Sequence, residues 1–142
     1  MPGRNASQLY SLLVGLGLVA GGVLGFFYSA SFATGDDLER EAVLGVLDVN
    51  AWHNIVHVAT GAAALAFSRS YSASRAFALI FGFTYLAVAV LGFIVGDGEA
   101  IAGLVPVNTE DNVLHVLIAV AGLLAFAATP ATPPPTTVEP AA

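Results

Sequence analysis

The sequence predicts an all-α membrane protein, a four-helix transmembrane bundle built from two tandem helical hairpins. Three observations lead to this prediction. The 142 residues are 57% hydrophobic and 10% charged, with a mean hydropathy of +0.83, whereas roughly a quarter of the residues in a soluble domain are charged. Four apolar stretches each approach the roughly 20 residues that cross a bilayer. Finally, segments 41–66 and 99–124 repeat one another at a constant offset of 58 residues.

The repeat fixes the relation that we expect between the two hairpins. Ten of the 26 aligned positions are identical, around a shared V-N-x3-N-x2-H string. The segment Val23–Phe26 also matches Val90–Phe93, at an offset of 67. A unit of two spans returns the chain to its starting side. The two copies are therefore expected to be parallel repeats, related by a pseudo-two-fold axis along the membrane normal.

The first repeat is expected at residues 9–68, after a short N-terminal segment, 1–8. Its first span is the uncharged stretch 9–32, which we do not interpret as a cleaved leader because it has a copy later in the chain. Residues 35–49 are polar and then amphipathic, which predicts a short helix or re-entrant cap on the outer membrane surface. Residues 51–67 form the second span.

The second repeat is expected at residues 69–128. It consists of a polar turn, a span at 75–95, a shorter outer cap at 96–107 and a span at 109–128. The tail, 129–142, contains five of the seven prolines and one charged residue. That composition predicts a disordered, Pro-rich extension.

The charges predict orientation and exclude some partners. Arg4, Arg69 and Arg75 fall on one side of the predicted membrane and Arg40 on the other. The positive-inside rule then places both termini in the cytoplasm of a multi-pass protein of the cell (plasma) membrane. The net charge of −6 with no basic stripe argues against nucleic acid as a partner. The absence of cysteine excludes thiolate metal sites and disulfides.

Repeated asparagines and histidines are the polar residues of interest. Asn50 and Asn108 each stand one residue before a span, where an Asn side chain caps a helix N-terminus. Asn54 with His57, and Asn112 with His115, are three residues apart and share a helix face. Because polar groups facing lipid are costly, these faces are expected to point inward and to bring the two histidines together.

The repeated pairs have two principal interpretations. In the first, the side chains hydrogen-bond between helices and fix their packing. In the second, His57 and His115 ligate haem iron or a transition metal, with Asn54 and Asn112 orienting the imidazoles. A proton relay is a third possibility. His53 receives little weight, since Asp111 occupies the equivalent position in the copy.

Glycines at four-residue spacing predict close helix packing. Gly17, Gly21 and Gly25 lie in the first span, and Gly92 and Gly96 repeat the pattern in the third. Small residues at this spacing let helix backbones approach. We favour packing within the chain over a contact between two copies.

The strings VNAWHNIVHVATG and LVPVNTEDNVLHVLIAVAGL resemble the two halves of a small four-span membrane family of bacteria and haloarchaea, catalogued as domain of unknown function 4383. The resemblance covers residues 10–126. It implies the fold, the membrane location and a role for particular residues, but no activity. Those residues are Asn50, Asn54, His57, Pro106, Asn108, Asp111, Asn112 and His115.

The leading functional hypothesis is a non-enzymatic structural or accessory membrane subunit that needs no cofactor. Its expected partners are the lipid bilayer and either copies of itself or a larger complex. No phosphate-binding loop or paired intramembrane carboxylates point to an enzyme. The alternative is a haem- or metal-binding protein for electron transfer, using His57 and His115. A weaker alternative is a small-solute channel or carrier along the pseudo-axis.

Overall fold

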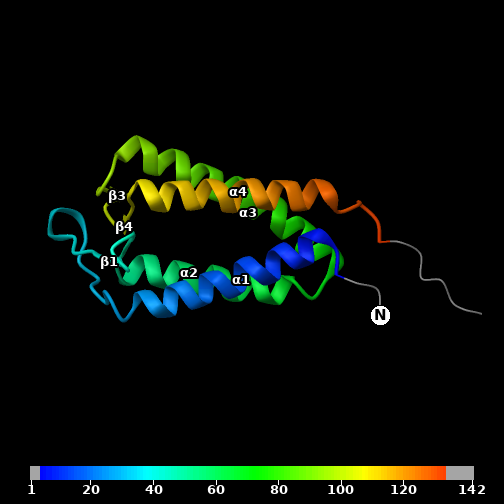
Figure 1. Cartoon of the computed structure of the whole chain (residues 1–142), viewed down its shortest axis with the longest axis horizontal. Helices are drawn as coiled ribbons and strands as arrows, with labels where there is room; N and C mark the ends of the chain where they lie inside the picture. The colour runs from blue at the N-terminus through cyan, green and yellow to red at the C-terminus, as the bar shows by residue number, and fades with distance from the viewer. Residues whose placement is uncertain (1–3, 134–142) are drawn as a thin grey trace, which may run out of the picture.

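The computed structural model describes residues 4–133, which fold mostly into α-helix (Figure 1). The described part holds four α-helices, two short β-hairpins and one 3-10 turn, and each half of the chain has the order helix, hairpin, helix. In order they are α1 Ala6–Gly25, η1 Gly35–Asp37, β1 Glu41–Val43, β2 Leu47–Val49, α2 Ala51–Phe67, α3 Tyr71–Val95, β3 Ala100–Ile101, β4 Val105–Pro106 and α4 Thr109–Ala128.

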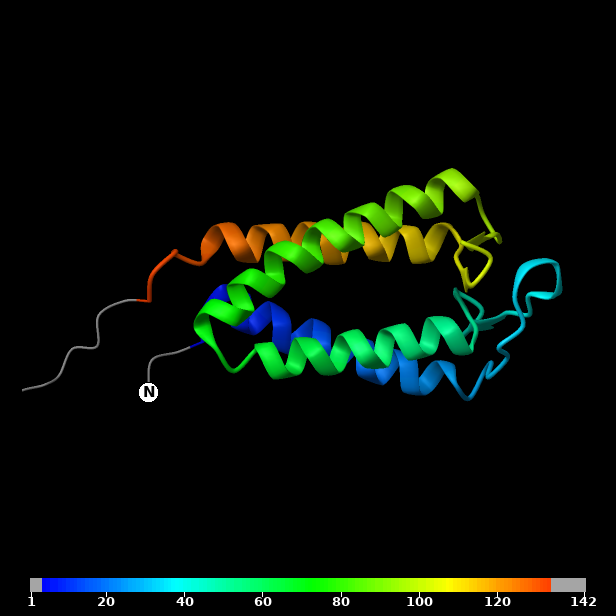
Figure 2. The same ribbon diagram turned by 180° about the vertical axis from the view of Figure 1, so that it is seen from behind.

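The helices pack in sequential pairs. α1 lies along α2 and α3 lies along α4, and the hairpins sit at the end of the molecule opposite the N-terminus (Figures 1 and 2). Helices α1, α3 and α4, of 20, 25 and 20 residues, are long and apolar enough to cross a membrane. Helix α2 has 17 residues. The architecture is therefore mostly helical, with membrane-compatible helices.

The predicted outer caps contain β-hairpins and no α-helix, so the all-α prediction is wrong in detail. Within 35–49, β1 pairs with β2, and within 96–107, β3 pairs with β4, both antiparallel. Each hairpin turns through two residues of positive φ, Leu44 (54°) and Gly45 (71°) in one, Ala102 (55°) and Gly103 (66°) in the other. These are the signs of a type I′ turn, which favours Gly at its second central position.

The helix ends differ from the predicted spans. The span predicted at 9–32 is too long at its C-terminal end: α1 begins at Ala6, where Asn5 forms a capping box with Gln8, and ends at Gly25. Residues 26–32 leave the helix, and the Ser29 carbonyl accepts a hydrogen bond from Asn54 Nδ2 (2.9 Å). The span predicted at 75–95 begins earlier, at Tyr71, because Ser70 caps α3.

The predicted disordered tail does not begin at residue 129. Thr129 is 1% exposed. Its Oγ1 accepts a hydrogen bond from the Ser7 backbone N–H (3.0 Å), and its carbonyl accepts one from Arg75 Nε (2.9 Å). These bonds tie the end of α4 to the starts of α1 and α3. The rest of the predicted tail, from residue 134, lies outside the described residues.

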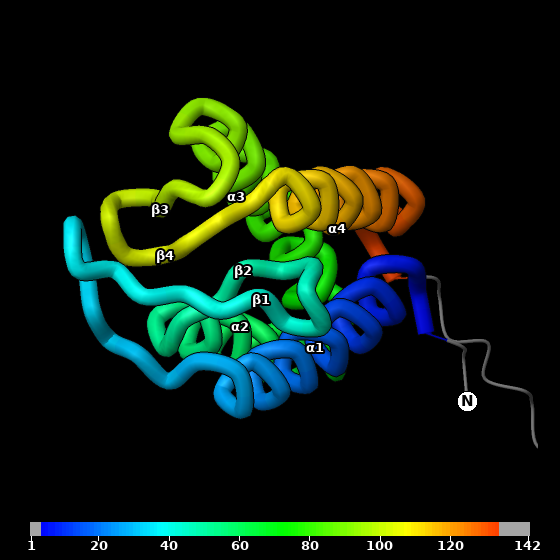
Figure 3. The backbone as a smooth tube through the Cα atoms, turned by 60° about the vertical axis from the view of Figure 1, so that its left-hand side comes forward, coloured from blue at the N-terminus to red at the C-terminus, as the bar shows by residue number. Residues whose placement is uncertain are grey.

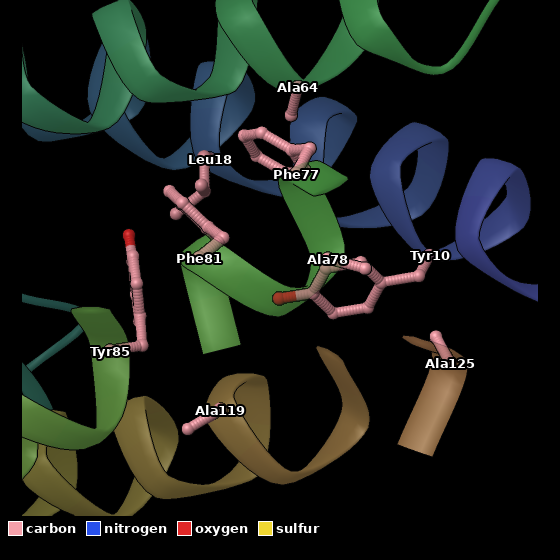
Figure 4. Packing of buried hydrophobic residues seen from close by; sticks show 9 residues of the cluster. All are labelled: Tyr10, Leu18, Ala64, Phe77, Ala78, Phe81, Tyr85, Ala119 and Ala125. Atoms are coloured by element: carbon pink, nitrogen blue, oxygen red, sulfur yellow. The ribbon is translucent and has the colours of Figure 1, made fainter. Parts of the chain in front are cut away.

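An aromatic ladder fills the interior between the helix pairs (Figure 4). Phe77, Phe81 and Tyr85 lie four residues apart on α3, and the ring centroids of successive members are 4.6 and 4.4 Å apart. Below them, Tyr10 of α1 donates its hydroxyl hydrogen to the Ile118 carbonyl of α4 (3.1 Å). A core filled in this way gives no support to a solute path along the axis of the described part.

Three of the five predicted packing glycines pack against nothing among the described residues. A Cβ on Gly17 or Gly21 would meet no atom within 4 Å, because these positions face outward from α1. Gly96 also faces open space, and its φ of 102° ends α3. Gly25 and Gly92 are different, since each packs directly against a buried amide, Asn54 in α2 and Asn112 in α4 respectively.

The cap asparagines link the two halves reciprocally. Asn50 Oδ1 accepts from the His53 N–H at the start of α2 (2.9 Å), while its Nδ2 donates to the Leu104 carbonyl of the second hairpin (2.7 Å). Asn108 Nδ2 likewise donates to the Val46 carbonyl of the first hairpin (2.7 Å). The hairpins consequently meet through β2 and β4 at one end of the molecule (Figure 3).

The glycine contacts give a first prediction. Gly25→Ala and Gly92→Ala should each destabilise the protein by about 1–3 kcal/mol, because the added methyl overlaps a buried side-chain amide. Gly17→Ala and Gly21→Ala are the matched controls and should leave stability unchanged or slightly raised. Thermal unfolding in mild detergent measures all four. Equal effects in the two pairs would contradict the packing described above.

The asparagine links give a second prediction. Asn50→Ser and Asn108→Ser retain a capping hydroxyl but cannot reach the opposite hairpin, so each leaves a carbonyl without its donor. Each should cost about 1–3 kcal/mol. Asn5→Ser is the control, because the described structure shows the Asn5 side chain hydrogen-bonded only within the first turn of α1, and it should change stability by only a few tenths of a kcal/mol. A similar loss of stability in all three variants would mean that Asn50 and Asn108 act only as helix caps.

Candidate functional site

Three histidines converge beneath the hairpins. His53 and His57 come from α2 and His115 from α4, and one ring nitrogen of each lies within 4.8 Å of the others. His53 and His115 are 2% and 4% exposed, and His57 is partly buried. The structure thus brings together the two repeated histidines and adds a third that sequence reasoning had set aside.

His53 is held by its own N-terminal turn. The residue lies in the first turn of α2, where its N–H is bound by the Asn50 cap. Its Nδ1 is 2.8 Å from the Asp48 carbonyl oxygen. Because a carbonyl can only accept, Nδ1 carries the hydrogen and Nε2 presents a lone pair. That Nε2 is 3.1 Å from Nε2 of His57.

His115 completes the cluster from the opposite half. Its ring packs edge-on against Tyr85, with centroids 5.3 Å apart, and lies 6.4 Å from the centroid of His53. Its Nδ1 is buried without a hydrogen-bond partner among the described residues. A buried ring nitrogen without a partner is costly in an apolar interior, so it calls for a ligand or a compensating group.

The histidines border a small cavity of about 150 Å³ between α2 and α3. Its wall is otherwise apolar or aromatic, apart from two threonine hydroxyls and the phenol of Tyr85, and contains no Asp or Glu. The lining residues are His53, Val56, His57, Thr60, Phe81, Thr84, Tyr85, Val88, Ile101, Val105 and His115.

Asn54 and Asn112 do not support the imidazoles. Both amides turn toward the neighbouring helix of their own pair, where they pack on Gly25 and Gly92. No hydrogen bond joins either amide to a histidine in the described structure. The hypothesis that these asparagines orient the imidazoles is therefore wrong, and the Asp48 carbonyl takes that place for His53.

The signal for His53 was present in the sequence. His53 and His57 are four residues apart on one helix, a spacing that places two imidazoles on the same face. The repeat does not reveal His53, because Asp111 occupies the equivalent position in the second copy. Its counterpart Asp111 binds backbone groups instead. Its Oδ2 accepts hydrogen bonds from the Asp48 and Asn108 backbone N–H groups (3.0 and 3.2 Å).

Arg40 and Asp48 are charged residues in and beside the first hairpin, where the Asp48 carbonyl contacts His53. Arg40 Nε lies 3.2 Å from Asp48 Oδ2, and Arg40 also donates to the Gly98 carbonyl of the second half. Burial raises the pKa of the Asp48 carboxyl above its ordinary value, and the Arg40 guanidinium opposes this shift. These groups lie outside the cavity wall, so the site itself is formed by neutral ligands.

The arrangement suits a metal ion better than haem. Metal–nitrogen bonds of about 2.0–2.1 Å place neighbouring donor atoms about 3.3–3.5 Å apart, close to the His53–His57 separation of 3.1 Å. Imidazole is a ligand for zinc, copper, iron and nickel. Haem does not fit, because the cavity of about 150 Å³ is well below the roughly 300–1,000 Å³ of ordinary ligand pockets.

Comparisons with known proteins place the chain by family alone. No curated protein and no solved structure matches it. A family model does match over residues 8–128, which include the hairpins, all three histidines and nearly all of the four helices. This match confirms the resemblance seen in the sequence: the chain belongs to the family described as Domain of unknown function (DUF4383).

Proposed function

We propose that the protein is an integral membrane protein that binds one transition-metal ion through His53, His57 and His115. The observation that carries the proposal is the convergence of three ring nitrogens within 4.8 Å, from two helices of different halves. The second ring nitrogen of His53 faces a backbone carbonyl, an arrangement common among metal-binding histidines. The buried Nδ1 of His115, which has no hydrogen-bond partner among residues 4–133, also supports it.

In the proposed topology all four helices span the cell membrane as two parallel repeats, with both termini in the cytoplasm. The distribution of arginine supports this orientation, because Arg40 lies in the loop before the first hairpin while Arg69 and Arg75 lie at the α2–α3 turn. The metal site then lies near the outer surface, beneath the hairpins, joining the two halves of the bundle.

A second candidate is a purely structural role in an accessory or self-associating subunit. It is favoured by the His53–His57 contact, since a 3.1 Å separation between two Nε2 atoms is also that of a neutral hydrogen bond. In this alternative His53 and His57 bond to each other within α2, and His115 packs against His53 from α4 without any ion. The two roles differ in one measurable respect, which is whether added metal changes the protein.

Metal titration tests the proposal. The purified protein in mild detergent should bind one equivalent of a first-row transition-metal ion per chain. At a hundredfold excess over Kd, that ion should stabilise the fold by about 2.7 kcal/mol, measured as a rise in unfolding temperature. His53→Ala, His57→Ala and His115→Ala should each abolish this stabilisation, because each removes one of three ligands.

Thr84→Val is the matched control, since Thr84 borders the same cavity but its hydroxyl donates to the Ile80 carbonyl of its own helix. It should bind metal as the unaltered protein does. Metal binding that survives in the histidine variants would contradict the site. If no ion binds while all three variants are destabilised, the structural role holds instead.

A further inference from the structure

We propose that the ion held by His53, His57 and His115 is monovalent copper, Cu(I). This inference rests on the proposed metal site and adds the identity and charge of its ion. It is argued from two observations, the absence of any carboxylate in the described cavity wall and the lack of a free fourth ligand.

The first observation concerns charge. The cavity wall is formed by α2, α3, β3, β4 and α4, and its only ionisable groups are the three histidines and Tyr85. The nearest acids are otherwise engaged: Asp111 accepts two backbone N–H bonds, and Asp48 pairs with Arg40. Three neutral imidazoles therefore leave the full charge of a bound ion uncompensated.

Burying that charge favours the lower valence. The electrostatic cost of moving an ion from water into an apolar interior rises with the square of its charge, so it is four times greater for a divalent than for a monovalent ion. A divalent ion held by three neutral imidazoles leaves twice as much charge in this region as a monovalent ion does. Monovalent copper needs less compensation, and imidazole is a good ligand for it.

The second observation concerns coordination number. Zinc bound by three histidines takes a fourth ligand, from the protein in a closed site or from water in an open one, whereas Cu(I) is stable with three nitrogen donors alone. The remaining polar groups of the wall are poor ligands. The hydroxyls of Thr60 and Thr84 donate to the Val56 and Ile80 carbonyls of their own helices (2.6 and 2.9 Å). Tyr85 would have to lose its phenolic proton to contribute.

The experiment compares ions on the intact protein in phosphatidylcholine nanodiscs under anaerobic conditions. Cu(I), buffered by a chromogenic chelator, should bind at one equivalent per chain and at least a hundredfold more tightly than Zn(II) or Co(II). Ag(I), also monovalent, should compete with it. X-ray absorption of the copper-loaded sample should give three nitrogen neighbours.

A pair of isosteric variants tests the charge argument itself. Thr60→Asp places a carboxylate at the cavity wall, and Thr60→Asn places a neutral group of the same shape there. The ratio of Cu(I) to Zn(II) affinity should fall at least tenfold in the Asp variant relative to the Asn variant. Thr84→Asp and Thr84→Asn, at the exposed rim of the cavity, provide a second pair if the first does not fold.

The outcomes separate this inference from the proposed site. Histidine-dependent binding of Zn(II) or Co(II) that is tighter than that of Cu(I) would overturn the inference and leave the metal site standing. Equal ion preference in the Asp and Asn variants would overturn the charge argument. Binding of no ion, monovalent or divalent, would remove both.

Discussion

The structure depends on satisfying polar groups where little water is available. In a membrane, every backbone N–H and C=O that is not paired costs several kcal/mol, and the turns between helices are where pairing is hardest. Here the connecting segments fold into β-hairpins, and the carbonyls left over at Val46 and Leu104 receive hydrogens from Asn108 and Asn50. The same asparagines cap the N-termini of helices α2 and α4. The hydrogen bonds of these two side chains therefore fix the helix ends, the hairpins and the contact between the two halves.

This arrangement also creates the site. By fixing the first turn of α2 beneath the first hairpin, the Asn50 cap sets the direction of His53, whose Nδ1 then meets the Asp48 carbonyl. His115 arrives from the other half, two turns into α4. The aromatic ladder ends at Tyr85, directly against His115. The cluster thus lies between the hairpins, which are polar, and the apolar interior. Few groups there can hydrogen-bond to an unpaired imidazole nitrogen, so a ligand is its main remaining partner.

Most of the helical architecture could be predicted from the sequence, because long apolar runs between polar turns have few other solutions. The hairpins could not, since residues 41–49 and 100–106 also suit amphipathic helix, and only Gly45 and Gly103 mark the turns. The repeat located His57 and His115 but hid His53, whose significance lies in spatial convergence rather than repetition. The glycine pattern misled for a similar reason: spacing gives no information about which helix face is covered, and Gly17 and Gly21 face outward.

The reciprocal links have a consequence for how the chain is made. In the proposed topology, helices α1 and α2 are synthesised and enter the bilayer before α3 and α4. At that stage the Val46 carbonyl and Asn50 Nδ2 lack their hydrogen-bond partners from the second half, and His53 and His57 have no third imidazole. The first half is therefore an incomplete insertion intermediate whose outer end must stay hydrated until the second half arrives.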